Sequence, residues 1–281
     1  MKKIVALLIL ASVVFSVCLV GCGQPSQTVA TSPPSEYNQI HRIESNRLAE
    51  DTVVHEGLTD ILPDLKDLVR DSLGDRDYLN WEQFEAVCEI REFKSPETVG
   101  DFAETTAFYP AGSRMVVVCP KFFNIGDGDQ QTYTLAHELV HALTGSGKSG
   151  EEKSTNLFME GITDYLTNSM LINTDLNYTP NYQNELYCIF WLATLYGDDK
   201  IVEIICSGRI LEFIDEQTGR VGDGANLHNA LATLDKSNSR EEVRNAILAE
   251  INILRAVSGS NIEVSEKFTE IFKTAYAPYL N

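Results

Sequence analysis

Basic residues are scarce in this sequence: its 281 residues include 22 Lys and Arg but 41 Asp and Glu, a formal net charge of −19 at pH 7. No cluster of Lys or Arg stands out. Because contacts to nucleic-acid phosphates need concentrated positive charge, we exclude nucleic acid as a partner. The acidity favours solubility and repels anionic surfaces, but it does not identify a substrate.

Proline and glycine are also few, with 9 and 18 residues, which excludes a low-complexity chain. The sequence has no internal repeat. Its hydrophobic fraction of 43% is enough for a sizeable core. The length suits one folded unit with two lobes around a cleft, or at most two small domains. We expect a monomer.

The sequence has only six cysteines, and the four outside the N-terminal export region do not have the spacing of a metal-binding motif. Two of them, Cys18 and Cys22, belong to the N-terminal export region described below. The other four allow three disulfide pairings, which the sequence does not separate, and buried free thiols are an equal alternative. These four are Cys88, Cys119, Cys188 and Cys206.

The N-terminus has the features of an export signal. Lys2 and Lys3 precede an apolar run at residues 4–17, which is short for a membrane span. The segment Leu19-Val20-Gly21-Cys22 resembles the lipobox of bacterial lipoproteins, in which the cysteine is lipidated. We therefore expect residues 1–21 to be a lipoprotein signal peptide. A diacylated Cys22 would anchor the protein to the cell membrane, facing the extracytoplasmic side.

Residues 22–35 are rich in Gln, Ser, Thr and Pro and contain almost no large apolar side chain. Such a segment cannot bury a core, so it predicts a flexible tether. We expect the folded part over residues 36–281, with a mainly helical lobe from about residue 175.

Hydrophobic periodicity predicts an α+β fold, with strands mostly before residue 120 and helices after it. The clearest strand is the run at residues 114–119, and residues 37–73 read as helical. Residues 84–93 fit either a helix or a strand, and Ser95 is the expected cap of a helix that starts at Pro96. Further helices are predicted at residues 130–143, 156–171, 184–196, 200–214, 226–234, 240–257 and 263–276.

The pattern His137-Glu138-Leu139-Val140-His141 lies in the helix predicted at 130–143. His137 and His141 project from one helix face one turn apart, so their imidazoles can bind a single Zn²⁺. Glu138 lies about 100° around the helix, where it can accept a proton from activated water without being a ligand. A chance match on a surface helix is the alternative, but the flanking residues are largely apolar and buried polar groups need partners.

Glu160 and Asp164 are four residues apart in the helix predicted at 156–171, so both carboxylates face one side of it. Two acids on the inward side of an apolar helix require a cation and a hydrogen-bond donor. Both needs are met if Glu160 is the third zinc ligand and Asp164 accepts the N–H of a ligand histidine. The alternative for Glu160 is a solvated helix acid.

Together, these five polar residues resemble the HExxH…ExxxD arrangement of the gluzincins, which thermolysin-like peptidases and zinc aminopeptidases share. The resemblance spans about fifty residues, from the strand at 114–119 to Tyr165. It implies a zincin-like fold: a small N-terminal mixed sheet with the active-site helix, a mainly helical C-terminal lobe, and a zinc cleft between them. It implies an edge strand that pairs with the substrate, for which residues 114–119 are the candidate. The implied site is one catalytic Zn²⁺ held by His137, His141 and Glu160, with Glu138 as general base and Asp164 bonded to a ligand histidine.

The sequence departs from both groups of this family. Gly161 follows the third ligand where thermolysin-like enzymes have Asn, and the Gly-x-Met-Glu-Asn motif of the aminopeptidases is absent. The third histidine of metzincins is missing from residues 144–147. We therefore expect a divergent gluzincin that acts as an endopeptidase on peptides or proteins.

Gluzincins stabilise the oxyanion with a Tyr or His from the other lobe, and the candidates here are His228, Tyr182 and Tyr187. His228 ranks first because it follows Gly222-Asp223-Gly224, where a loop could reach the cleft. Two other functions stay open. One is a peptidase-like lipoprotein that binds peptides or envelope components without cleaving them. The other is a structural zinc site, which a His₂Glu ligand set favours less.

Overall fold

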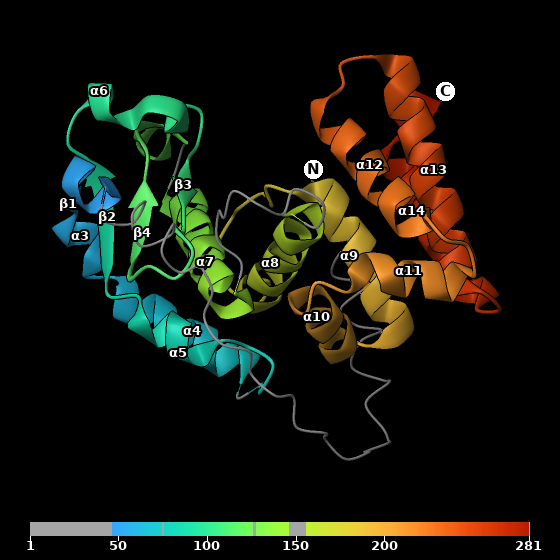
Figure 1. The fold of residues 1–281 in the computed structure, drawn as a ribbon, viewed down its shortest axis with the longest axis horizontal. Helices are drawn as coiled ribbons and strands as arrows, with labels where there is room; N and C mark the ends of the chain where they lie inside the picture. Colours follow the sequence, from blue (N-terminus) through green and yellow to red (C-terminus); the bar gives the residue numbers. More distant parts are fainter. Residues whose placement is uncertain (1–46, 75, 126–127, 146–155, 281) are drawn as a thin grey trace. The chain divides into compact units, whose positions relative to one another are not determined.

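The computed structural model describes residues 47–74, 76–125, 128–145 and 156–280. The predicted signal peptide, Cys22 and the predicted tether lie outside the described residues. A small sheet and the helices around it come first in the chain, and within the described part only helices follow residue 156 (Figure 1). The predicted α+β class is confirmed.

A four-stranded mixed sheet has the strand order β1-β2-β4-β3. Strand β1 (Thr52–Val54) pairs antiparallel with β2 (Glu89–Phe93), and β2 pairs parallel with β4 (Met115–Val118). The short strand β3 (Ala107–Phe108) then pairs antiparallel with β4. The two edges of the sheet are therefore β1 and β3.

The strand predicted at residues 114–119 is confirmed as β4, but its expected role as the edge strand is wrong. Both of its sides are occupied, by β2 and by β3. Val116 and Val118 pack into the main core, whereas Val117 packs with Phe108 in a smaller cluster on the other face. This burial on both faces is typical of an inner strand and explains the unbroken apolar run.

Helices α7 (Gly128–Thr144) and α8 (Asn156–Leu171) lie side by side and match the helices predicted at 130–143 and 156–171 (Figure 1). Every residue of α7 from Tyr133 to Thr144 is buried. Helix α8 also packs on α9 (Gln183–Tyr196). Because a helix buried on all sides cannot turn its polar side chains to solvent, those of α7 must find partners inside the protein.

The other helices surround these three. They are α3 (Glu56–Thr59), α4 (Leu62–Leu73), α5 (Trp81–Ala86), α6 (Pro96–Val99), α10 (Asp198–Cys206), α11 (Ile210–Thr218), α12 (Asp223–Lys236), α13 (Arg240–Ser258), α14 (Ile262–Ala275) and α15 (Ala277–Leu280). Two 3₁₀ turns, Gly100–Phe102 and Pro120–Asn124, complete the described elements. Helix α6 has Ser95 as its cap, as predicted.

Two helix predictions need correction. Residues 52–54 form strand β1 instead of continuing the helix expected at 37–73, and the apolar stripe of that region belongs to α4. The helix expected at 200–214 is two helices, α10 and α11. Gly208 separates them with a φ of 73°, a conformation that glycine adopts at helix ends.

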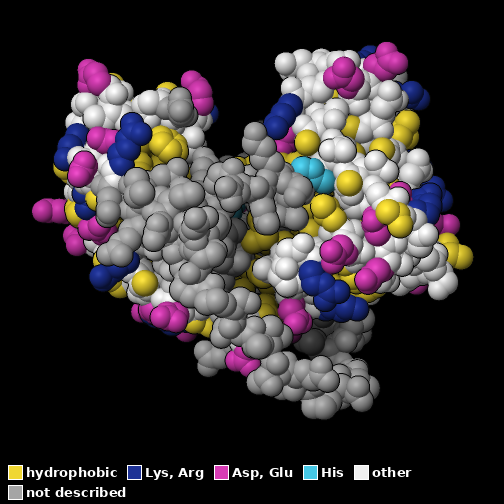
Figure 2. Space-filling model, in the orientation of Figure 1, with side chains coloured by type: hydrophobic (Ala, Val, Ile, Leu, Met, Phe, Trp, Pro, Cys, Tyr) yellow, Lys and Arg dark blue, Asp and Glu magenta, His cyan; other side chains and the backbone are white. Residues whose placement is uncertain are grey.

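No disulfide joins the four cysteines of the described residues. No helix in the described ranges is long and apolar enough to cross a membrane. On the face drawn in Figure 2, acidic and basic side chains of the described residues are interspersed.

Candidate metal centre

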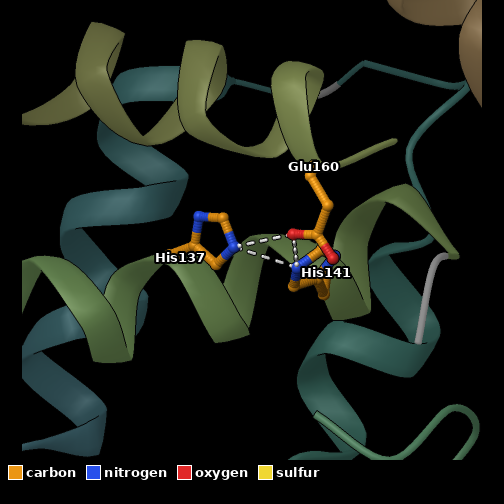
Figure 3. Close-up of side chains that lie close together, drawn as sticks. All are labelled: His137, His141 and Glu160. Carbon is orange, nitrogen blue, oxygen red and sulfur yellow. Dashed lines mark hydrogen bonds and ion pairs between the residues drawn. The ribbon is translucent and has the colours of Figure 1, made fainter. Parts of the chain in front are cut away.

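Three side chains from two neighbouring helices converge on one point: His137 and His141 from α7, and Glu160 from α8 (Figure 3). His137 Nε2 lies 3.0 Å from His141 Nε2 and 3.2 Å from Glu160 Oε2. The distance from His141 Nε2 to Glu160 Oε2 is 3.1 Å. Ligand atoms of a tetrahedral zinc site, each about 2.1 Å from the ion, lie roughly 3.4 Å apart. The spacing of the three atoms therefore suits a metal ion.

Burial makes a positive charge at this point necessary. His137, Glu160 and His141 are 2%, 8% and 7% exposed. Two imidazole lone pairs and a carboxylate repel one another at 3 Å unless a proton or a metal cation lies between them. The group could therefore bind a metal ion.

Each histidine is also held through its second ring nitrogen. His137 Nδ1 lies 2.7 Å from Asp164 Oδ1, and His141 Nδ1 lies 3.3 Å from Thr163 Oγ1. Both partners lie on α8 and are fully buried. With a proton on Nδ1, each ring presents the lone pair of Nε2 to the same point, which is the tautomer that metal binding needs.

Glu138 approaches the sheet from the same helix. Its Oε2 accepts a hydrogen bond of 2.8 Å from the backbone N–H of Tyr109, the residue after β3. The carboxylate is 7% exposed and lines the same cleft as the three candidate ligands. A buried acid is thus held beside the three candidate ligands and next to the edge strand β3.

The cleft has a volume of about 380 Å³ and runs along β3 and the three residues that precede it. Within the described residues its wall contains no Lys or Arg, so the only groups there that can carry positive charge are the two histidines. The lining residues are Glu104, Thr105, Thr106, Ala107, Phe108, Tyr109, Thr134, His137, Glu138, His141, Glu160, Asn181 and Tyr182.

The charges of the site shift the pKa values of two candidate ligands. Burial by itself would lower the pKa of His137, but the carboxylates of Asp164 and Glu160 outweigh it and raise that pKa well above its usual value. Burial would raise the pKa of Glu160, but His141 and His137 hold it well below its usual range. In the metal-free protein a proton therefore occupies this network, and a metal must displace it, so metal binding weakens in acid.

Tyr182 lies in the cleft, whereas the other two oxyanion candidates do not line it. The Tyr182 ring stacks on that of His137, with centroids 5.8 Å apart, and burial raises the pKa of its phenol well above the usual value. Its hydroxyl therefore stays protonated and can donate. His228 lies on α12 with its ring centroid 6.2 Å from that of Phe158, and Tyr187 lies on α9 against Phe272.

Several residues of the site could not be found from the sequence. The backbone N–H of Tyr109 carries no side-chain signal, and Thr163 differs from many other helix threonines only in its place beside His141. The phenol of Tyr133, which donates to Asp164 at 2.5 Å, had a detectable signal: it lies one helical turn before His137.

No protein-family model, curated protein or solved structure matches this chain.

Proposed function

We propose that this protein is a zinc-dependent peptidase of the gluzincin type, with His137, His141 and Glu160 as zinc ligands. The observation that carries the proposal is the convergence of these three atoms in a buried site, with the carboxylate of Glu138 in the same cleft. Zinc is the metal that suits two imidazoles and one carboxylate with a position left for water.

Zinc bound there would activate a water molecule and polarise the scissile carbonyl. Glu138 accepts the proton of the attacking water and returns it to the leaving amine. Its hydrogen bond to Tyr109 N–H occupies one lone pair of Oε2 and fixes the carboxylate, so that Oε1 stays available for proton transfer. Asp164 holds the His137 ring, as an outer carboxylate commonly does in zinc sites.

Strand β3 offers a surface for the substrate backbone. Cys119 N–H donates to Thr106 O at 2.9 Å, and the pairs Ala107 with Val118 and Phe108 with Val117 follow in register. Bonded and non-bonded pairs alternate in an antiparallel ladder, so Ala107 directs its N–H and C=O away from β4. Ala107 lines the cleft, and an extended peptide could pair with it there.

Tyr182 is the best-placed donor for the oxyanion. Its ring packs beside a candidate ligand and its phenol keeps its proton. A donor in a water-poor cleft stabilises developing negative charge more than one in open solvent. Because no mark of free N-terminus recognition is present in the sequence, we favour an endopeptidase.

Cleavage of a broad peptide library by the zinc-loaded protein, followed by mass spectrometry, tests this proposal. We expect Glu138→Gln to keep its zinc but to lose roughly 10²- to 10⁴-fold in cleavage rate, since general-base catalysis contributes about that much. Glu104→Gln is the matched control, because Glu104 also lines the cleft but is exposed, and it should stay active. A zinc-loaded wild type that cleaves nothing would contradict the proposal and favour a peptide-binding lipoprotein without turnover.

We propose further that lipidated Cys22 anchors this peptidase to the membrane, facing the extracytoplasmic side. The support is the lipobox-like Leu19-Val20-Gly21-Cys22 after an apolar run. Cys22→Ser should move the protein from the membrane fraction to the soluble fraction of its host cell. A variant that stays in the membrane fraction would contradict the anchor.

A further inference from the structure

Asp164 receives three hydrogen bonds and has no exposed surface. Its Oδ1 lies 2.7 Å from His137 Nδ1 and accepts the hydroxyl of Tyr133 at 2.5 Å. Its Oδ2 accepts the backbone N–H of Tyr182 at 2.6 Å. With no solvent at the carboxylate, each missing donor would leave a buried lone pair unpaired.

Tyr133 shares one oxygen of Asp164 with the candidate ligand His137. It lies on α7 one turn before that histidine, and its side chain is fully buried. Because the phenol and the imidazole meet at the same Oδ1, the hydroxyl fixes the position of the atom that orients the imidazole. Rotation of the carboxylate would break both bonds together.

The ring of Tyr133 is itself held in place. It stacks on Tyr178, with centroids 4.7 Å apart and planes 17° apart, and the Tyr178 hydroxyl donates to Asn168 Oδ1 on α8 at 3.0 Å. The segment that carries Tyr178 is tied to the first turn of α7, where Gln130 exchanges two hydrogen bonds with the backbone of Thr179. The phenol therefore cannot swing away from Asp164 without breaking this packing.

We propose that Tyr133 is a positioning residue for the metal centre, which acts through Asp164 to fix the ring of His137. This inference rests on the proposed zinc site, but it does not depend on what the site cleaves. A residue that only fills the core would contribute to stability alone. A positioning residue changes metal affinity and ligand geometry as well.

Zinc affinity, measured by competition with a chromophoric chelator, separates these two roles. Tyr133→Phe removes one oxygen and should weaken zinc binding by about tenfold or more, as loss of such partners commonly does. Tyr165→Phe is the matched control: Tyr165 is also buried, on α8, but its phenol adjoins Asp198 instead of Asp164. The control should bind zinc like the wild type, and only Tyr133→Phe should alter the visible spectrum of the Co²⁺-substituted protein.

A double-mutant cycle tests the route of the effect. In an Asp164→Ala background, Tyr133→Phe should weaken zinc binding no further, because the acceptor through which it acts is already removed. Additive losses, or a Tyr133→Phe variant that binds zinc like the wild type, would overturn the inference and leave the proposed function intact. A wild type that binds no zinc would overturn both.

If circular dichroism shows that Tyr133→Phe does not fold, the variant Tyr178→Leu tests the inference instead. This change removes the ring that packs on Tyr133 and leaves the phenol of Tyr133 in place. Weaker zinc binding would support the inference, and unchanged binding would overturn it.

Discussion

Gly161 follows the candidate ligand Glu160 and lies where α8 meets α9. A Cβ built on Gly161 would lie 2.7 Å from the Cβ of Glu185 and 3.1 Å from its carbonyl carbon. A side chain at this position would therefore collide with α9. Close packing of α8 on α9 therefore accounts for glycine at this position. The same packing brings the N-terminus of α9 and Tyr182 towards the site.

Gly161→Ala should lower the free energy of unfolding by about 1–3 kcal/mol, the usual cost of an added methyl group in a packed core. Urea unfolding measures this change. Gly57→Ala in α3 is the matched control, because its added Cβ would meet nothing closer than 3.7 Å. Equal stability of Gly161→Ala and the wild type would show that α9 moves aside at little cost.

At the residue scale, the sequence predicts side chains that a helical period places together. His137 and His141 are one turn apart, as are Glu160 and Asp164, and a period of four is enough to put each pair on one face. The same reasoning fails for His228. Whether a histidine on α12 reaches the cleft depends on tertiary packing, which no local period encodes.

Two glutamates are buried in the helical part of the protein. Glu185 on α9 is 1% exposed, and Glu250 on α13 is 0% exposed. None of their four carboxylate oxygens has a hydrogen-bond partner among the described residues. Burial raises the pKa of Glu250 well above its usual value, and Glu185 adds to the effect. Burial, with the charge of Asp235 added, raises the pKa of Glu185 to about 9. Both acids are therefore neutral in the folded protein near pH 7.

Because of these two buried acids, we expect the free energy of unfolding to fall as pH rises. Each acid holds its proton more tightly in the folded protein than in the unfolded chain, where the pKa of Glu is about 4.3. The contribution of Glu185 to the unfolding free energy is therefore highest in acid and falls between about pH 4.3 and pH 9, and Glu250 acts in the same direction. Above that range the folded carboxyl of Glu185 ionises as well, and its part of the loss levels off.

Glu250→Gln keeps the shape and removes one of the two titrating groups. We expect its unfolding free energy, measured in urea at several pH values, to fall less between pH 6 and pH 9 than that of the wild type. Glu266→Gln on exposed α14 surface is the matched control and should keep the wild-type slope. If the unfolding free energies of the wild type and Glu250→Gln fell equally with pH, Glu250 would not be buried in its neutral form.

At the scale of elements, long helices are the features that the sequence predicts best. Helix α8 has the predicted bounds, because its apolar period continues through Gly161 to Leu171. Strand β3 has two residues, too few for an alternating pattern, and its position at the edge depends on pairing with β4. The sequence therefore favoured the long run of β4 for the edge, which pairing contradicts.

The whole chain is acidic, with a net charge of −19, and the candidate site is also rich in acidic side chains. Three carboxylates of the site, those of Glu138, Glu160 and Asp164, are 7%, 8% and 0% exposed. A bound divalent cation would offset part of this buried negative charge. Metal binding should therefore stabilise the entire fold.

Removal of the metal with a chelator should lower the melting temperature. A ligand that binds only the folded state adds about 4 kcal/mol of stability at roughly 1,000 times its Kd. Differential scanning calorimetry with and without chelator measures the change. His141→Ala, which lacks one ligand, is the control and should respond weakly. If the chelator left the melting temperature of the wild type unchanged, no metal would be bound at the candidate site.

The overall arrangement of the chain could be predicted only coarsely. Strands mostly before residue 120 and helices after it followed from periodicity, but the strand order β1-β2-β4-β3 joins segments that no local pattern links. The grouping of His137, His141 and Glu160 could be predicted because these residues come from two helices adjacent in sequence, α7 and α8.

Anomalous X-ray scattering at the zinc absorption edge, from crystals of the zinc-loaded protein, would locate bound zinc directly. We expect one strong peak about 2 Å from His137 Nε2, His141 Nε2 and a carboxylate oxygen of Glu160. A map without a peak between these three side chains, or with zinc bound only elsewhere, would contradict the proposed zinc site.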